Sequence, residues 1–364
     1  MKDDEKSEQT AETSAENSLE TERLCIVGIG ASAGGLEAIR EMLAGAPTDA
    51  NLAYVVIQHL DPNHESLLAE LLSRHTDLTV KQVSGGEKIR AGNVYIIPPG
   101  VGLSVSQGVL DLTDFAQPRG LRRPIDDFFE SLALDQGRFG ACVILSGTGA
   151  DGSAGLRAIK EHGGLCVVQD PRTAKYDGMP TSAQNTGMVD LVRRPSEIVD
   201  AIQQYYAHSF VDTADAKLAN TIEENLNDIC AVVRNFVGHD FSGYKQSTLI
   251  RRVQRRVQVL DLDDAEQYLQ HIRSDPSECE LLFRDLLINV TRFFRDPEHF
   301  KVLRETAIRP MVQNAGNEDE IRVWVPGCSS GEEAYSIAML FADECRAQKR
   351  SVNIQIFATD IDEQ

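Results

Sequence analysis

Short apolar runs alternate with amphipathic stretches along the first two hundred residues, and this alternation is what most constrains the fold. The apolar runs cover 24–29, 52–57, 94–97, 141–145 and 165–168, and helical patterns cover 36–43, 66–73 and 154–159. Strands that are apolar throughout are typical of parallel sheets covered by helices on both faces. We therefore predict an α/β domain with a doubly wound, mostly parallel sheet.

The composition excludes several classes of protein. The 364 residues include 36 Lys and Arg against 56 Asp and Glu, a formal net charge of −20. This acidic total argues against a nucleic-acid binder, which needs a basic surface. No stretch of about 18 apolar residues exists and no signal peptide precedes the domain, so we expect a cytoplasmic protein without membrane insertion. Its seven cysteines are expected to be reduced, with no disulfide and no metal site.

The character of the sequence changes several times along the chain. Residues 1–22 are acidic and nearly free of large apolar side chains, which is typical of a disordered tail. We expect the sheet domain at 23–206 and a polar linker at 207–222. Residues 223–305 predict several helices and no strand. A strand–turn–helix–strand pattern returns within 306–364, and because one such unit is not a complete sheet, we expect a truncated third domain there.

A glycine-rich turn follows the first apolar run, with the sequence Gly28-Ile-Gly30-Ala-Ser32-Ala-Gly34-Gly35. A dinucleotide loop is one interpretation, because its glycines let a pyrophosphate approach a helix N-terminus. A nucleophile elbow around Ser32, which would expose the serine hydroxyl, is the second. A plain tight turn with Ser32 as the helix N-cap is the third. This segment alone fits all three.

Two other strand ends favour the nucleophile. The second apolar run ends at His59, where a dinucleotide fold would carry a ribose-binding acid, although Asp61 lies close behind. The run at 141–145 is followed by a loop that ends in Asp151. The carboxyl ends of parallel strands share one edge of the sheet, so Ser32, His59 and Asp151 are expected to meet there. A serine needs a base to take its proton, and the base needs an acceptor to fix its tautomer. The spacing therefore predicts a Ser–His–Asp triad.

These segments resemble three signature segments of the chemoreceptor methylesterases of the CheB type. The similar segments are 28–35, 58–59 and 145–152, and the resemblance covers about 23–205. It implies hydrolysis of glutamate methyl esters on receptor helices, often with glutamine deamidation, and no cofactor.

The same resemblance implies the roles of individual residues. Ser32 would be the nucleophile, His59 the base and Asp151 the residue that orients the base. The backbone N–H of Thr148 would serve the oxyanion hole.

A second glycine turn, 326–331, follows the apolar run at 321–325, and the next run ends at Asp360. A glycine turn after one strand and an acid after the next are typical of folds that bind an adenosyl group. In such folds the carboxylate accepts hydrogen bonds from the ribose hydroxyls. No basic residue stands in this turn, which disfavours a phosphate ligand.

Together with the upstream segment 289–297, this turn resembles the chemoreceptor glutamate methyltransferases of the CheR type over about 223–364. The resemblance implies that S-adenosylmethionine is bound by Asn289, Thr291, Arg295, Glu333 and Asp360. Arg295 would pair with the methionine carboxylate, Glu333 would accept from the ammonium group, and Asp360 would hold the ribose. Because we expect this domain to be incomplete, we predict weak or no binding of the cofactor.

A basic segment at 245–258 contains no acid, and its predicted helix carries Arg251, Arg252, Arg255 and Arg256. One interpretation of these arginines is a solvated helix face. Another is a surface that docks to an acidic receptor helix bundle, which the resemblance also implies. Nucleic acid is a third and weaker explanation.

The sequence thus predicts a bifunctional chemotaxis receptor-modification protein that acts on the cytoplasmic helices of methyl-accepting chemoreceptors. It would combine a protein-glutamate methylesterase with an incomplete protein-glutamate O-methyltransferase. Two alternatives remain: a nucleotide-dependent oxidoreductase that uses the Gly28 loop, and a non-catalytic signalling scaffold.

Overall fold

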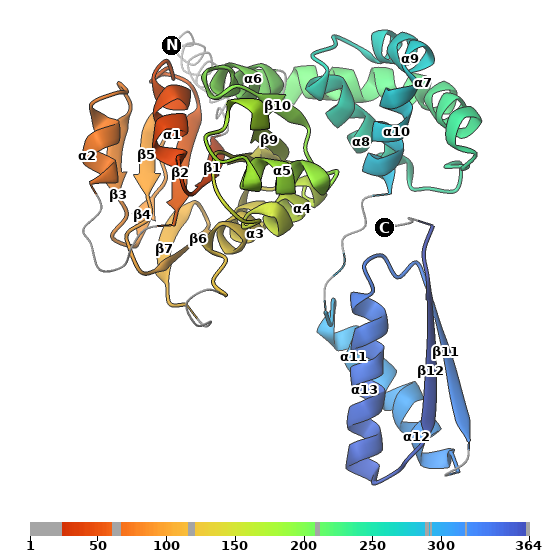
Figure 1. Cartoon of the computed structure of the whole chain (residues 1–364). Coiled ribbons are helices and arrows are strands. Elements are labelled where there is room, and N and C mark those ends of the chain that lie inside the picture. The colour runs from red at the N-terminus through yellow and green to blue at the C-terminus, as the bar shows by residue number, and fades with distance from the viewer. Residues whose placement is uncertain are drawn as a thin grey trace, which may run out of the picture. The chain divides into compact units, whose positions relative to one another are not determined.

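The computed structural model describes residues 24–59, 67–115, 121–207, 212–287, 291, 293–316 and 319–361 (Figure 1). The predicted acidic tail, 1–22, lies outside the described residues. The chain divides into two compact units, Met1–Phe283 and Arg284–Gln364.

A parallel sheet forms the centre of the first unit. Its seven strands lie in the order β10-β9-β8-β1-β2-β5-β3, and all their pairings are parallel. The strands are β1 (Cys25–Ala31), β2 (Leu52–Gln58), β3 (Thr79–Gln82), β5 (Asn93–Ile96), β8 (Gly140–Ile144), β9 (Leu165–Gln169) and β10 (Leu191–Arg193). Every residue of β1 is buried, because this strand lies in the middle of the sheet. The predicted doubly wound, mostly parallel sheet is confirmed.

Helices cover both faces of this sheet (Figure 1). One face packs against α1 (Gly35–Leu43), α2 (Leu68–Ser73) and α6 (Pro195–Ala207). The other packs against α3 (Pro124–Gln136), α4 (Ser153–Glu161) and α5 (Gly178–Asn185). A small antiparallel sheet, which the sequence analysis did not predict, consists of β4 (Glu87–Lys88), β7 (Val109–Thr113) and β6 (Gly102–Ser106).

Two glycines of β1 allow α3 to pack closely on the sheet. A Cβ added to Gly28 would lie 2.9 Å from Phe129 Cε1, and one added to Gly30 would lie 2.5 Å from Ile125 Cγ2. Both positions are therefore filled by side chains of α3, and no pyrophosphate has room there. The dinucleotide-loop interpretation of this turn is not supported, which removes the basis for an oxidoreductase.

A helical region completes the first unit. It contains α7 (Asp212–Val237), α8 (Gln246–Val259), α9 (Ala265–Ser274) and most of α10 (Pro276–Leu286). Helix α7 begins inside the segment expected to be a linker, 207–222. The reason is that Leu218, Ile222, Leu226 and Ile229 recur at helical spacing and are all buried.

Helix α8 packs on the sheet domain through arginines. Arg255 donates to both carboxylate oxygens of Asp190 and, from Nη2, to Gly164 O at 2.7 Å. Arg252 donates to Lys160 O at 3.2 Å. The arginine face of α8 is therefore an internal contact surface.

This packing corrects the predicted receptor-docking face. Arg252, Arg255 and Arg256 are only 4%, 3% and 3% exposed, and Arg256 pairs with the buried Glu278. Three of the four predicted arginines are thus unavailable to a receptor, and only Arg251 is exposed. The error arose because the acids that pair with them lie far away in the sequence.

We expect Asp190→Asn to destabilise the first unit by about 3–5 kcal/mol, the usual result of removing one partner from a buried ion pair. Asp190 is buried and also pairs with Lys160 at 3.2 Å. Burial favours the neutral acid, but Arg255 and Lys160 outweigh it and hold the pKa of Asp190 well below its ordinary value. The stabilisation is therefore present at neutral pH and is lost as the pH falls below about 4.

Urea unfolding at pH 7 measures this effect. Asp170→Asn is the matched control, because Asp170 pairs with the exposed Arg172 and such surface pairs contribute little to stability. Equal losses in the two variants would contradict the role of Asp190.

The second unit is built around one long helix. Its elements are α11 (Pro297–Leu303), a π-helical turn (Arg304–Ile308), α12 (Arg309–Asn314), β11 (Glu320–Pro326), α13 (Glu332–Gln348) and β12 (Asn353–Thr359). β11 and β12 pair in parallel, as the predicted strand–turn–helix–strand pattern requires. The unit begins earlier than the expected boundary at 306, because Arg304 bonds Glu344 of α13 at 2.6 Å and α12 packs on the same helix.

All seven cysteines are unbridged. Within the described ranges, no helix combines the length and apolar character needed to cross a membrane. The same part of the chain contains no cluster of three His, Cys, Asp or Glu side chains that could hold a metal ion.

Candidate active site

A tight turn presents Ser32 directly after the central strand β1. Ser32 N donates to Ser146 O at 3.0 Å, and Gly35 N donates to Ser32 O at 3.0 Å. Gly34 has φ +73°, and a Cβ there would lie 2.8 Å from Ser146 Oγ, so this position requires glycine. Gly34, not Ser32, is the N-cap of α1, and no side chain caps that helix. The N-cap interpretation of Ser32 is therefore wrong.

Ser146 fixes this turn to the loop after β8, and the sequence analysis missed it. Its side chain is buried, donates to Ala33 O at 2.9 Å and accepts from Tyr176 N at 3.0 Å. Its own N–H donates to Gln169 Oε1 at 2.8 Å. The only sequence signal was its place as the first polar residue after a buried strand.

His59 and Asp151 contact each other at the same sheet edge. His59 follows β2 directly, and its Nε2 lies 3.0 Å from Asp151 Oδ2. The histidine side chain is 37% exposed and that of Asp151 is 9% exposed. The His59 imidazole is thus open to a bound molecule, whereas the Asp151 carboxylate is largely shielded from water.

The N-terminus of α3 holds the Asp151 carboxylate. Ile125 N donates to Oδ2 at 3.2 Å, and Asp126 N donates to Oδ1 at 3.1 Å. These N–H groups have no partner inside the helix, and the positive end of the helix dipole favours an anion. The sequence analysis missed this helix, although Pro124 and two acids in its first turn are helix-start signals.

The loop after β8 also closes on Ser32. A Cβ on Gly147 would lie 2.9 Å from Ser32 Cβ and 2.1 Å from Met179 Sδ, so glycine lets the loop approach the serine. Gly147 N donates to Tyr176 O at 3.0 Å, and Gly147 O accepts from Met179 N at 2.9 Å. Thr148, the predicted oxyanion-hole residue, comes directly after Gly147 in the loop that these hydrogen bonds fix, and its side chain is exposed.

The structure therefore brings the three predicted residues to one edge. Ser32, His59 and Asp151 follow β1, β2 and β8, which are neighbours with β1 in the middle. Their catalytic roles remain predictions.

Comparison with known proteins gives the family of this domain. Residues 27–202 match the model of the CheB methylesterase family. A putative protein-glutamate methylesterase/protein-glutamine glutaminase of Leptospira interrogans is 34% identical over 173 residues, which are 47% of this chain and 90% of that protein. The chain belongs to the CheB methylesterase family.

Other relatives extend or repeat this match. An uncharacterized 104.1 kDa protein of Rhodobacter capsulatus is 36% identical over 317 residues, 81% of this chain and 33% of that protein. A protein-glutamate methylesterase/protein-glutamine glutaminase of Pseudomonas aeruginosa is 36% identical over 193 residues, 52% of this chain and 54% of that protein. The chain thus spans between a third and about half the length of these two relatives. The CheB methylesterase catalytic domain of Thermotoga maritima is 31% identical, with a TM-score of 0.46, over 49% of this chain and 97% of that one.

The rest of the chain matches a second family. Residues 224–287 match the CheR methyltransferase, all-alpha domain, and residues 289–364 match the CheR methyltransferase, SAM binding domain. The predicted resemblance to CheB and CheR proteins is confirmed.

In the CheR-like unit, the structure brings Asp360 to the second glycine turn. Ser329 N donates to Asp360 Oδ2 at 2.6 Å. A Cβ on Gly327, whose φ is +68°, would meet no atom within 4 Å, so space lies beside the turn. This carboxylate beside an open turn fits an adenosyl ligand. Asn289 lies outside the described residues, and Thr291, Arg295 and Glu333 keep their roles only as predictions.

A second acid, Asp126, lies beside Asp151 in the CheB domain. Its side chain is buried and accepts from Gly155 N at 2.8 Å. Burial raises the pKa of Asp126, and the charge of Asp151 adds to the rise. Its ionisation at neutral pH therefore costs folding free energy.

We expect Asp126→Asn to raise the melting temperature at pH 7, because the amide is uncharged and still accepts from Gly155. An acid with a raised folded-state pKa lowers stability as the pH rises above its ordinary pKa of about 4. The advantage of the variant should thus vanish near pH 3. A thermal scan at both pH values checks this, and a variant that is less stable at pH 7 would contradict it.

Proposed function

We propose that the CheB domain hydrolyses glutamate methyl esters by serine catalysis. The observation that carries this is the His59 Nε2–Asp151 Oδ2 contact of 3.0 Å, beside the strand that ends just before Ser32. Family membership and the printed activity of the relatives support the same reaction.

In the first step, Ser32 Oγ attacks the ester carbonyl and His59 takes the serine proton. Asp151 engages Nε2, so Nδ1 is the nitrogen that accepts this proton. The collapse of the tetrahedral intermediate expels methoxide, which leaves as methanol with the proton from His59. Ser32 then carries the glutamyl acyl group.

The negative oxygen of the tetrahedral intermediate needs N–H donors. We assign this role to the backbone N–H of Thr148 and to the N–H groups of the first turn of α1 that follow Gly35, whose own N–H already donates to Ser32 O. The latter have no intrahelical partner, and the positive end of the helix dipole favours the developing charge.

In the second step, His59 takes a proton from water, and the resulting nucleophile releases glutamate from Ser32. Glutamine deamidation follows the same route with ammonia in place of methanol. We propose methyl-accepting chemoreceptor helices as the substrate in both cases.

Methanol release from a glutamate-methylated receptor peptide tests this proposal. A serine-directed phosphonate should label the chain once, and mass spectrometry should locate the label at Ser32. Labelling elsewhere together with full turnover would reject the mechanism.

We further propose that the CheR-like unit carries residues of a site for S-adenosylmethionine, which supplies a methyl group when bound, and that this chain binds it weakly. Asp360 beside the glycine turn would hold the ribose, with Glu333, Thr291 and Arg295 near the methionine end. Calorimetry with S-adenosylhomocysteine tests this, and Asp343→Asn is a matched control for Asp360→Asn, because Asp343 is an exposed acid of the same unit. Equal affinities of the two variants would contradict the role of Asp360.

A further inference from the structure

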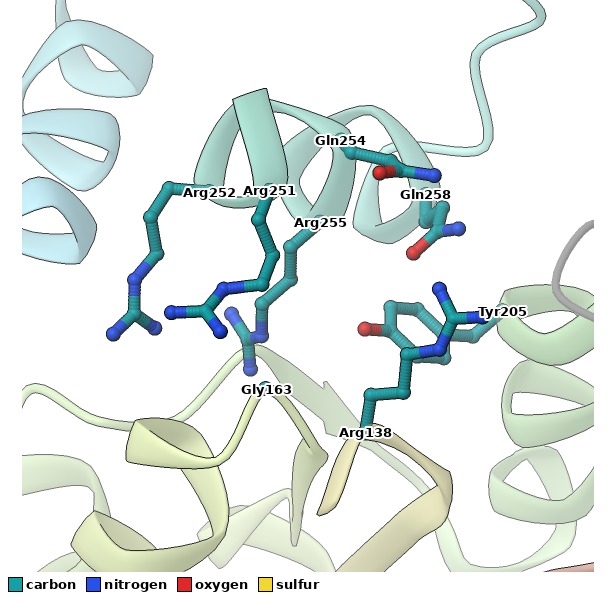
Figure 2. A pocket seen from close by; sticks show the side chains of 8 residues that line it. All are labelled: Arg138, Gly163, Tyr205, Arg251, Arg252, Gln254, Arg255 and Gln258. Atoms are coloured by element: carbon teal, nitrogen blue, oxygen red, sulfur yellow. The ribbon is translucent and has the colours of Figure 1, made fainter. Parts of the chain in front are cut away.

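The buried arginines of α8 do not offer a docking surface to a substrate. The guanidinium groups of Arg252 and Arg255 extend from α8 toward Gly163 of the CheB domain (Figure 2). There they bind an acid and backbone carbonyls of that domain. Contacts that select a substrate are therefore left to residues nearer to Ser32.

The segment that leads from β9 to α5 packs directly on the glycine turn after β1. Tyr176 N donates to Ser146 Oγ at 3.0 Å, and Tyr176 O accepts from Gly147 N at 3.0 Å. Lys175 Nζ lies 3.9 Å from Glu37 Oε1 in the first turn of α1. Backbone hydrogen bonds thus fix this segment to the loop after β8, and its side chains reach α1.

The ring of Tyr176 packs against the same turn and is still 43% exposed. A Cβ added to Gly34 would lie 3.1 Å from Tyr176 Cδ2, so the ring covers the turn two residues after Ser32. Because the backbone and one side of the ring are already held, a partner that covers the exposed side costs little further side-chain entropy. Aromatic side chains presented in this way are enriched among the residues that dominate protein interfaces.

The strand order places Tyr176 and His59 on opposite sides of Ser32. The strands β9, β8, β1 and β2 are neighbours in this order, and the three residues follow β9, β1 and β2. All three lie at the carboxyl edge of the sheet, where parallel sheets bind their ligands. A side chain that reaches Ser32 therefore enters with His59 on one side and Tyr176 on the other.

We propose that Tyr176 selects helical protein substrates over small esters, an inference that rests on the ester hydrolysis proposed above. Only two methylene groups separate the ester of a methyl-glutamyl residue from its backbone. The helix that carries this residue therefore comes into contact with the rim of the site when the ester reaches Ser32. The Tyr176 ring then packs on the side chains one helical turn away from the ester. A small ester cannot make this contact.

Steady-state kinetics on two substrates measure this role. With a helical chemoreceptor fragment that carries glutamate methyl esters, Tyr176→Ala should raise KM about tenfold, the scale of losing an interface aromatic. Its kcat should not change, because the ring binds the ground state and the transition state alike. With p-nitrophenyl acetate, both constants should equal those of the wild type. Tyr176→Phe keeps the ring and should restore the wild-type KM.

Leu134→Ala is the matched control. Leu134 is 68% exposed near the C-terminal end of α3, whereas Asp151 is bound at the N-terminal end of that helix. This variant should leave both substrates unaffected. An unchanged KM in Tyr176→Ala would overturn the proposal. An equal loss of kcat on both substrates would overturn it as well, because the ring would then hold the Ser32 turn rather than contact the receptor helix.

Direct binding separates this inference from the hydrolysis on which it rests. Fluorescence anisotropy of the labelled receptor fragment, titrated with the full chain, gives the affinity without any need for turnover. A wild-type chain that binds the fragment but hydrolyses neither substrate would contradict the proposed hydrolysis, and about tenfold weaker binding by Tyr176→Ala would still support the contact. Absent binding, or equal affinities of the wild type and Tyr176→Ala, would overturn the contact whatever the turnover.

Discussion

Ser32→Ala is expected to lower methyl-ester hydrolysis by about 10⁴–10⁶-fold, the range found when the nucleophile of a serine triad is removed. Without Oγ no acyl-enzyme forms, and only the N–H donors around the site continue to assist attack by water. The fold should survive, because the bonds that hold this turn come from the backbone: Ser32 N to Ser146 O and Gly35 N to Ser32 O.

Methanol release from a methylated receptor peptide measures this loss, and circular dichroism checks the fold. Ser106→Ala is the matched control, because Ser106 is an exposed serine at the end of β6 in the same domain. Turnover by Ser32→Ala within tenfold of the control would reject Ser32 as the nucleophile. A wild-type chain without turnover would instead favour the non-catalytic scaffold.

The three strand ends were predictable because each signal is local. A buried parallel strand is apolar along its whole length, and the residue that follows it lies at the ligand-binding edge whatever the rest of the chain does. Ser32, His59 and Asp151 could therefore be placed without knowledge of any helix between them.

The hydrogen bonds that hold these three residues in place could not be predicted in the same way. The bonds from Ile125 N and Asp126 N to Asp151 join α3 to a loop about 25 residues later in the chain. Ser146 likewise connects two turns that are distant in sequence. The pattern of residues within a short stretch of sequence cannot predict hydrogen bonds between segments so far apart in the chain.

For the arginines of α8, the local sequence pattern led to a wrong prediction of exposure. Four arginines in two turns of helix are typical of a solvated face. Arg255, however, pairs with Asp190, 65 residues earlier, and Arg256 pairs with Glu278 across the helical region. Only the tertiary partner decides whether such a face is buried.

Asp151→Asn is expected to lower turnover on the order of 10⁴-fold, as in other triads where the orienting acid becomes an amide. The wild-type carboxylate accepts from three groups: His59 Nε2, Ile125 N and Asp126 N. Asparagine offers one oxygen and one NH₂ group. If the NH₂ group faces His59, it donates to Nε2 and moves the ring proton to Nδ1, the nitrogen that must accept the serine proton.

If the NH₂ group turns instead toward Asp126 N, two donors face each other at the N-terminus of α3, and the loop that carries residue 151 is displaced. Both orientations therefore remove the correctly oriented base. Asp127→Asn is the matched control, since it makes the same change at an exposed position in the first turn of α3. Turnover is compared per folded molecule, because losing the charge at the helix N-terminus also lowers stability. A loss below tenfold would mean that Asp151 only anchors α3, and the base would then have to be oriented by another group.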